Sequence, residues 1–390
     1  MPCKSTIAAF HAEMAAWRQR IHANPETAFE EVATAELVAG LLREFGLEVH
    51  RGLAKTGVVG TLRCGSGGRS IGLRADMDAL HIEELTNLPY RSRVPGKMHA
   101  CGHDGHTAML LGAAKYLAES RNFDGIVHFI FQPAEENVAG GRTMVEDGLF
   151  RLFPVEAVFG MHNMPGIEVG KMAMMPGPMM ASADFFEIQV TGKGAHAAFP
   201  HQGVDPVLLG AEIVMALQRI VSRTTDPLQA AVVSVTQFHA GHTTNVIPET
   251  AVLSGTTRAL LPGVQDEIER AIRQIATGIA QAHGASVLCR YDRRYPPTIN
   301  TAAETAVSAR AAGAVVGPGN VLSDLPPVMG AEDFAWMLRE RPGCYVWIGN
   351  GREQGGCHVH NPHYDFNDAI LPIGASYWAT LVEQVLTAGK

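Results

Sequence analysis

The amino-acid sequence predicts an α/β protein in which a small α+β domain interrupts a larger three-layer domain built on a mixed sheet. Three observations support this prediction. The chain has 390 residues, which is more than a domain with a single hydrophobic core usually contains. Apolar, strand-like runs alternate with helical patterns in its first half and again near its end. Between residues 182 and 294 the order of predicted elements changes, which indicates a separate domain.

Four apolar runs predict the strands of the larger domain, with helical patterns between and after them. Because these strands are apolar along their whole length, both faces of their sheet are expected to be covered. The glycine-rich segment 65–70 lies between two of these strands and predicts a hairpin turn. The predicted strands are Gly57–Cys64, Ser70–Asp76, Gly125–Gln132 and Val155–Met161, and the predicted helices are Ser5–Ala23, Glu30–Phe45, Gly105–Ser120, Thr301–Ala312, Ala331–Arg339 and Ile373–Leu386.

The middle of the chain follows the order strand, helix, strand, strand, helix, strand, which is typical of a ferredoxin-like α+β domain. Runs rich in glycine and proline at 174–180 and 293–300 bracket it. We therefore expect a discontinuous three-layer domain, 1–181 and 295–390, with an inserted domain at 182–294. The predicted elements of the insert are Phe185–Thr191, Pro206–Arg223, Ala230–Phe238, Thr250–Thr257, Gln265–His283 and Ser286–Tyr291.

The composition excludes several classes of protein. Hydrophobic residues make up 46% of the chain and charged residues 18%, as in folded globular proteins. The 31 Lys and Arg against 39 Asp and Glu give a formal net charge of −8, so neither nucleic acid nor an anionic membrane is an expected partner. Six irregularly spaced cysteines predict no disulfide framework. The amphipathic N-terminus and the lack of a run of about 18 apolar residues predict a cytoplasmic location.

Residues 98–109 (MHACGHDGHTAM) place a thiol, imidazoles and a carboxylate at the start of a predicted helix. Cys101 and His103 stand two residues apart, and Asp104 follows. Thiolate and imidazole groups are good ligands for borderline metals such as Zn, Mn, Ni or Co. On this segment alone, an ordinary buried cysteine beside a surface histidine remains an equal alternative.

A second motif, FQPAEENVAGG (131–141), ends a predicted strand with the adjacent carboxylates of Glu135 and Glu136. Two like charges at a strand end are unfavourable unless cations or solvent compensate them. One glutamate could bind a metal ion while the other moves a proton to and from water. For an isolated pair of glutamates, a solvated acidic loop is the competing interpretation.

Two further histidine motifs complete a candidate metal site. The strand Val155–Met161 leads directly into His162, and the C-terminal motif CHVHNPHYDFND carries His358, His360 and His363. Each histidine alone would more often be structural. Together with Cys101, His103 and Glu136, however, they fall at or near strand ends of one domain. Five such donors and one spare glutamate suffice for two metal ions and a bridging water.

Other polar residues have less specific surroundings. Asp76 and Asp78, in LRADMDAL, stand at the end of a predicted strand. Either could bind metal or orient an imidazole, and Asp78 could equally cap a turn. In the inserted domain, Arg258 could bind a substrate carboxylate through two hydrogen bonds, and His196 and Asn245 could donate hydrogen bonds to an oxyanion. Ordinary surface residues would look the same in the sequence.

These motifs, in this order, resemble the di-metal amidohydrolases that include hippurate hydrolases, N-acyl-amino-acid amidohydrolases and auxin-conjugate hydrolases. Aminoacylases and glutamate-releasing carboxypeptidases are more distant relatives of that family. The resemblance covers essentially the whole chain. It rests on the segments 20–26, 73–80, 98–114, 131–136, 160–166, 192–206, 245–249, 255–258, 330–336 and 360–368.

The resemblance implies a role for each matching position. It implies Glu135 as the catalytic general base and Arg258 as the residue that binds the substrate carboxylate. It also implies that His196 and Asn245 are presented across a dimer interface to the partner's site. Glu332 matches a carboxylate near the site, and Asp76, Asp78 and Asp104 are expected close to it without being assigned as ligands. The implied metal ligands are Cys101, His103, Glu136, His162 and His360.

The function implied by the resemblance is metal-dependent hydrolysis of N-acyl amino acids to a carboxylic acid and a free amino acid. Two divalent metal ions (Mn, Zn, Ni or Co) are the implied cofactors, and a homodimer or higher homo-oligomer is the implied assembly. A dipeptidase or carboxypeptidase on the same scaffold, and a metal-binding protein without catalytic activity, are the alternatives. The acyl group, the amino acid and the metal are not determined by the sequence.

Overall fold

The computed structural model describes residues 4–351 and 357–387, and the chain divides into two compact units. Unit 1 consists of Met1–Met179, Ile299–Pro326 and Asp333–Lys390, and unit 2 of Met180–Thr298 and Pro327–Glu332. The domain limits expected from the sequence, 182 and 294, lie close to two of these boundaries. The short segment Pro327–Glu332 was not expected to group with the insert.

Unit 1 is built on an eight-stranded mixed sheet, formed by β1 (Glu48–Leu53), β2 (Gly57–Cys64), β3 (Ser70–Asp76), β4 (Gly125–Gln132), β5 (Ala157–Pro165), β6 (Met172–Ala173), β15 (Val321–Leu322) and β16 (Gly343–Gly351). Their order across the sheet is β1-β2-β4-β3-β5-β16-β6-β15. β3 is parallel to both β4 and β5, and β16 is parallel to β5. The carboxyl ends of these four strands therefore meet at one edge of the sheet.

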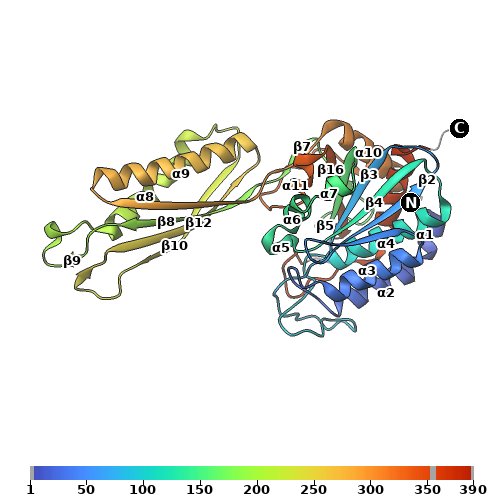
Figure 1. Cartoon of the computed structure of the whole chain (residues 1–390), viewed down its shortest axis with the longest axis horizontal. Coiled ribbons are helices and arrows are strands. Elements are labelled where there is room, and N and C mark those ends of the chain that lie inside the picture. Colours follow the sequence, from blue (N-terminus) through green and yellow to red (C-terminus); the bar gives the residue numbers. More distant parts are fainter. Residues whose placement is uncertain (1–3, 352–356, 388–390) are drawn as a thin grey trace. The chain divides into compact units, whose positions relative to one another are not determined.

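The helices of unit 1 are α1 (Ser5–Ala9), α2 (His11–His22), α3 (Val32–Glu44), α4 (His103–Ser120), α5 (Glu135–Val138), α6 (Gly140–Glu146), α7 (Leu149–Leu152), α10 (Ala302–Val316), α11 (Ala335–Glu340) and α12 (Leu371–Val385), with 3-10 turns η3 (Pro318–Asn320) and η4 (Asp368–Ile370). Every residue of β3 and of β16 is buried, which requires cover on both faces of the sheet. α4 packs against α2, α12 and β3, whereas α6 packs against β4 and α11 on the other side (Figure 1). The predicted three-layer architecture is confirmed.

Several local expectations for unit 1 were wrong. The segment 65–70 is no hairpin turn, because β4 lies between β2 and β3 in the sheet. The predicted strand Val155–Met161 instead runs as Ala157–Pro165, so His162 lies inside β5 and not after it. The predicted helix Ala331–Arg339 begins only at Ala335, since the backbone N–H of Asp333 donates to Glu135 Oε1 of α5 and its carboxylate accepts from the Gly141 N–H of α6. β1 and β16 were not predicted.

Unit 2 has the predicted ferredoxin-like order, with β8 (Ala183–Thr191), α8 (Pro206–Arg219), β10 (Ala231–Ala240), β12 (Thr250–Ala259), α9 (Pro262–Ala282) and β13 (Ser286–Tyr295). A π-helical turn, η2 (Ile220–Thr224), extends α8, and a 3-10 turn, η1 (Pro200–Gln202), precedes it. The antiparallel sheet has the order β10-β12-β8-β13. Ile213 of α8 and Ile272 of α9 pack in one core with Ile188 and Leu253 of this sheet. The helices therefore cover the same face.

Small two-stranded sheets complete the chain: β9 (Ala195–His196) with β11 (Val246–Ile247) in unit 2, and β7 (Gly177–Met180) with β14 (Thr298–Asn300). No helix among the described residues has the length and apolar character needed to cross a membrane.

Candidate metal centre

The candidate site lies at the carboxyl edge shared by β4, β3 and β5, which are neighbours in the sheet. β3 ends at Asp76, β4 ends just before the Glu135–Glu136 pair, and His162 lies near the end of β5. α4 begins beside them with His103, preceded by Gly102 in the left-handed conformation at φ 94°. The parallel strands thus bring together donors that are far apart in the sequence.

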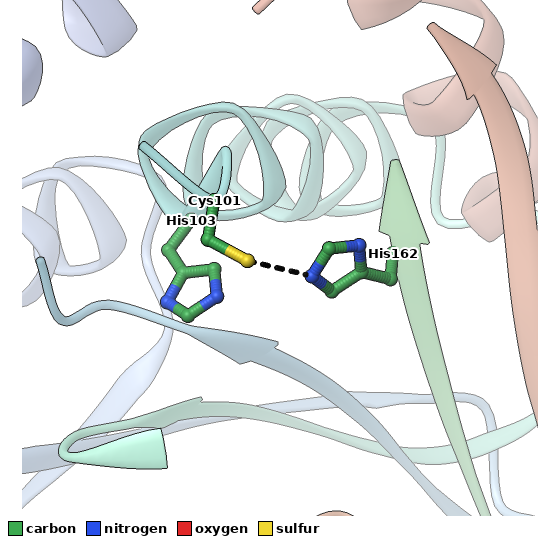
Figure 2. A group of neighbouring side chains, drawn as sticks. All are labelled: Cys101, His103 and His162. Atoms are coloured by element: carbon green, nitrogen blue, oxygen red, sulfur yellow. Dashed lines mark hydrogen bonds between the residues drawn. The ribbon is translucent and has the colours of Figure 1, made fainter. Parts of the chain in front are cut away.

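The five predicted metal ligands lie together in overlapping groups. Donor atoms of Cys101, His103 and His162 lie within 4.8 Å of one another, as do those of Cys101, Glu136 and His360. Within the first group, Cys101 Sγ lies 3.3 Å from His162 Nε2 (Figure 2). Within the second, Glu136 Oε1 lies 3.2 Å from His360 Nε2, and it also lies 3.9 Å from Nε2 of His103 in the first group. Cys101 belongs to both groups, so two ions could share its thiolate.

The chemistry of these donors fits divalent cations. His103 is buried, its Nδ1 lies 3.1 Å from Asp78 Oδ1, and its Nε2 has no hydrogen-bond partner among the described residues. Burial, followed by the charges of Glu136 and Glu135, raises the pKa of the Cys101 thiol. Burial lowers the pKa of His103, but the carboxylates of Asp76 and Asp78 outweigh it and raise that pKa to about 10. Cations placed here would offset this negative charge and favour the thiolate and neutral imidazole.

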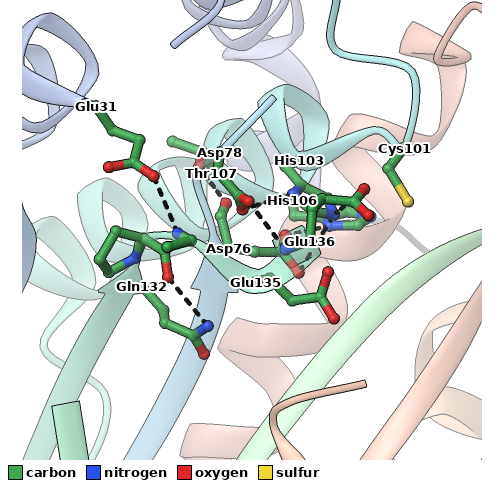
Figure 3. A network of polar contacts seen from close by, with 12 residues as sticks. Glu31, Asp76, Asp78, Cys101, His103, His106, Thr107, Gln132, Glu135 and Glu136 are labelled. Atoms are coloured by element: carbon green, nitrogen blue, oxygen red, sulfur yellow. Dashed lines mark hydrogen bonds and ion pairs between the residues drawn. The ribbon is translucent and has the colours of Figure 1, made fainter. Parts of the chain in front are cut away.

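Asp78 orients two candidate ligands, whereas Asp76 contacts His106, a buried histidine beside them. Asp78 holds His103 through Oδ1 and accepts the backbone N–H of Glu136 through Oδ2 at 3.0 Å (Figure 3). Asp76 Oδ1 lies 2.6 Å from His106 Nδ1, and its Oδ2 accepts a hydrogen bond from Arg74 at 2.7 Å. Burial opposes ionisation of Asp76, yet nearby His103 and Arg74 lower its pKa. Such carboxylates fix the orientation of imidazole ligands.

Glu135 has its own supports, separate from those of Glu136. Ala134 adopts the left-handed conformation at φ 57°, which turns the chain between β4 and the glutamate pair. The Ala134 N–H donates to Glu31 Oε1 at 3.0 Å, and the Asp333 N–H donates to Glu135 Oε1 at 3.4 Å. Burial raises the pKa of Glu31 to about 7. Glu135 is also grouped with His103 and Glu136, so its carboxylate lies beside the metal donors.

The carboxylate of Asp104 binds other residues than the metal donors. Its Oδ2 accepts from Arg18 Nη1 at 3.1 Å and lies 2.9 Å from His22 Nδ1. Burial opposes ionisation, but the hydrogen bond and charge of His22 lower the pKa of Asp104. Burial of His22 likewise opposes its charge, whereas Asp104 and Glu84 raise the pKa of His22 to about 9. The contacts of the Asp104 carboxylate therefore lie with Arg18 and His22 of α2.

Sequence reasoning missed a buried hub at Asn163, which directly follows His162. Its backbone N–H donates to His106 Nε2 at 2.9 Å, and its side-chain amide donates to the Cys101 carbonyl at 2.6 Å. Tyr364 Oη donates to its Oδ1 at 2.7 Å. The spacing of His106, three residues after His103 on a helix, was a usable signal, whereas nothing in the sequence marked Asn163.

The remaining predicted site residues belong to unit 2. His196 and Asn245 are exposed and lie together, because His196 pairs with Val246 across β9 and β11 and the Ala197 N–H donates to the Asn245 carbonyl. Arg258 lies in β12, where its Nη1 donates to Thr256 Oγ1 at 2.5 Å and to the Thr257 carbonyl. Glu332 is buried, and its carbonyl accepts from Thr298.

An α/β domain that gathers a thiol, imidazoles and carboxylates at one sheet edge, interrupted by a ferredoxin-like domain, defines a class of two-domain metallohydrolases. The chain belongs to Peptidase family M20/M25/M40, whose family model matches residues 72–384. It is 43% identical over 369 residues to a hippurate hydrolase of Campylobacter jejuni, covering 95% of each chain. It is 40% identical over 385 residues to an N-acetylcysteine deacetylase of Bacillus subtilis, covering 98% of this chain and 99% of the relative.

A solved structure gives the same result. A dinuclear metal binding peptidase of family M20 from Bacillus subtilis matches with a TM-score of 0.85 and 36% sequence identity. The match covers 97% of this chain and 99% of that one. The family resemblance and the fold class predicted from the sequence are therefore both confirmed.

Proposed function

We propose that the protein hydrolyses the amide bond of N-acyl amino acids with the help of two divalent metal ions. The observation that carries this proposal is the pair of three-donor groups that share Cys101, with Glu135 beside them. The relatives named hippurate hydrolase and N-acetylcysteine deacetylase act on amides of this kind by name, and they match this chain over almost its whole length.

Glu135 is the proposed catalytic base and acid. When bound, the metal ions supply Lewis acidity, which polarises a carbonyl and lowers the pKa of water toward about 7. Glu135 accepts the proton of the attacking water and returns it to the departing amine. The Asp333 N–H restrains one oxygen of Glu135, which keeps the carboxylate aligned beside the donors. Glu136, which lies near His103 and His360, is assigned to metal binding.

Three residues of unit 2 are proposed to recognise the substrate. Arg258 pairs with the free carboxylate of the amino-acid half, which gives a preference for acylated amino acids over simple amides. Its bonds to Thr256 and Thr257 restrict the guanidinium before substrate arrives. His196 and Asn245, which lie together in unit 2, donate hydrogen bonds to the developing oxyanion in the site of the partner subunit.

The proposal is tested by preparing metal-free protein, reloading it separately with Mn, Zn, Ni and Co, and assaying each form on a substrate panel. The panel contains N-benzoyl, N-acetyl and indole-acetyl amino acids, with dipeptides that carry a free N-terminal amine as controls. We expect turnover of acylated amino acids, loss of activity on metal removal and recovery on reloading. Cleavage of the free-amine dipeptides alone would instead make the protein a dipeptidase or carboxypeptidase.

Bound metal with no turnover on any substrate of the panel would make the protein a metal-binding protein without catalytic activity. The panel also identifies the preferred acyl group and the metal that supports the highest turnover. We further propose a homodimer or higher homo-oligomer in the cytoplasm. Light scattering of the metal-loaded protein tests the oligomeric state.

A further inference from the structure

We propose that Arg18 is a positioning residue that anchors the C-terminal segment carrying His360. It thereby controls how tightly the second metal ion is held, which is the ion of the group Cys101, Glu136 and His360; the first ion is that of the group Cys101, His103 and His162. The inference rests on the proposed di-metal function and extends it to a residue of the N-terminal helix α2. Arg18 touches none of the predicted metal ligands. It contacts carboxylates that lie on the same segments as two of them.

The guanidinium of Arg18 is fully buried among three carboxylates from two segments. Nη1 lies 3.1 Å from Asp104 Oδ2 and 3.7 Å from Asp365 Oδ1. Nε makes a short ion pair with Asp368. The guanidinium carbon also lies 4.6 Å from the centre of the Tyr90 ring, and Tyr90 Oη donates to Asp365. Removing one partner from such a buried charge cluster leaves the others uncompensated.

Helix α2 holds the end of this C-terminal segment with two further side chains. Gln19 Nε2 donates to Asp368 Oδ2 at 3.0 Å, and His11 Nε2 lies 2.9 Å from the Asp368 carbonyl. Asp368 begins the turn η4, which leads into α12. Three residues of one helix thus converge on a single aspartate that follows His360 by eight positions.

The two candidate metal groups depend on this anchor to different degrees. His103 lies in α4, is buried and is held by Asp78. His360 lies in a loop, adopts a left-handed φ of 65° and is half exposed. Its backbone N–H donates to the Ala100 carbonyl at 2.7 Å. A left-handed non-glycine residue is strained and is retained where its surroundings enforce it. Loosening the Arg18 cluster should therefore displace His360 more than His103.

The test measures metal binding directly in full-length protein. Metal-free wild type, Arg18→Gln and Arg18→Lys are titrated with Co²⁺, followed by calorimetry and visible absorption. Wild type is expected to bind two ions. Arg18→Gln is expected to bind the first ion with unchanged affinity and the second about 10–100-fold more weakly, as for other losses of a residue that supports a ligand. The turnover of Arg18→Gln is expected to recover when Co²⁺ is raised to saturation. The affinity of Arg18→Lys for the second ion is expected to lie between those of wild type and Arg18→Gln.

Two controls separate positioning from general loss of stability. Gln19→Ala removes one contact to Asp368 without removing a buried charge, and we expect a smaller weakening of the second ion only. Leu117→Ala makes a cavity in the same helix as His103, about 21 Å further along it. It should lower the melting temperature of the metal-free protein and leave both metal affinities unchanged.

Each outcome has a distinct meaning. If wild type binds two ions and Arg18→Gln, as a folded protein, binds both with wild-type affinity, this inference is wrong and the di-metal function stands. An equal loss of affinity for both ions in Arg18→Gln would also overturn it, as would a loss of affinity for the second ion in Leu117→Ala. If Arg18→Gln does not fold, Gln19→Ala decides, because unchanged affinity in that variant contradicts the anchor. If wild type binds no pair of ions, the proposed function itself fails.

Discussion

Glu135 and Glu136 are consecutive residues, yet the fold gives them different surroundings. The Glu136 backbone is held by Asp78, and its carboxylate faces His103 and His360. The Glu135 carboxylate instead receives the Asp333 N–H. Both residues open the short helix α5, in which consecutive side chains point about 100° apart, so one carboxylate can face the metal donors while the other exchanges protons.

Replacing Glu135 by Gln should remove catalysis while keeping metal and substrate. The amide has nearly the same shape and cannot accept a proton, so kcat should fall about 10²–10⁴-fold with KM changed little. Steady-state kinetics and metal analysis check this expectation. The matched control is Glu136→Gln, which should lose bound metal as well as activity. Near wild-type turnover in Glu135→Gln would remove Glu135 from the mechanism.

Gly102 shows why a residue without a side chain is needed beside the ligands. Its φ is 94°, and an added Cβ would lie 2.3 Å from Asn163 Nδ2 and 2.7 Å from Tyr364 Oη. Gly102→Ala should therefore destabilise unit 1 by about 1–3 kcal/mol and weaken metal binding, since Cys101 and His103 flank it. Gly40→Ala in α3, where nothing lies within 4 Å, should instead stabilise by about 0.5–1 kcal/mol.

Thermal unfolding and Co²⁺ titration distinguish the two glycine variants. Metal affinity should fall in Gly102→Ala and stay unchanged in Gly40→Ala. A Gly102→Ala protein with wild-type stability and metal content would mean that the Asn163 and Tyr364 side chains move away without consequence.

At this scale the sequence predicted the candidate donors and the supporting carboxylates of Asp76 and Asp78, but it missed other residues that hold the donors in place. Cys101 and Glu136 stand in motifs, and the structure places both among the donor groups. Asn163, Asp333 and Arg18 have partners as far as 57 to 350 positions away in the sequence. Such pairings depend on tertiary packing, to which local patterns are blind.

At the scale of the elements, the sequence predicted the arrangement of some neighbouring strands correctly and of others wrongly. The parallel neighbours β4, β3 and β5 bring their carboxyl ends together, as expected from apolar strands followed by polar motifs. The connection between β2 and β3 was misjudged, because a glycine-rich link between two strands is compatible both with a hairpin and with a passage over β4. Local turn chemistry cannot distinguish these two arrangements.

Within unit 2, the buried carboxyl group of Asp184 in β8 should make the free energy of unfolding depend on pH. Burial raises its pKa to about 6, although hydrogen bonds from Gln265 of α9 and Tyr291 of β13 oppose the rise. The folded state therefore binds this proton more tightly than the unfolded state. Stability is highest below the unfolded pKa of about 3.8 and falls by up to about 3 kcal/mol as the pH rises through 6.

Asp184→Asn should remove this pH dependence and stabilise unit 2 at pH 7.5, because the amide carries no charge and can still accept from Gln265. Hydrogen exchange in peptides of β8 and β12, compared at acid and neutral pH, measures the effect. Glu187→Gln on the same strand is the control: its carboxylate is exposed and pairs with Arg290, so a change below about 0.5 kcal/mol is expected. Loss of protection in Asp184→Asn at pH 7.5 would contradict the assignment.

For the whole molecule, the candidate metal centre joins segments separated by most of the chain. Its donors lie between positions 101 and 360, and all of them belong to unit 1. The sequence could predict this convergence because the donors stand in motifs at or near the ends of predicted strands or at the start of a predicted helix. It could not predict the depth of burial, which comes from packing both faces of the sheet.

Because the site exists only when unit 1 is folded, metal binding must stabilise this unit. At a free metal concentration of 100 times Kd, each site contributes about 2.7 kcal/mol, which raises the melting temperature by about 5 °C. All four tryptophans, Trp17, Trp336, Trp347 and Trp378, lie in unit 1, so tryptophan fluorescence reports its unfolding. Hydrogen exchange in β8 and β12 provides the reference from unit 2, where protection should change less. A fluorescence-detected transition that is the same with and without metal would show that these donors do not bind ions in the folded protein.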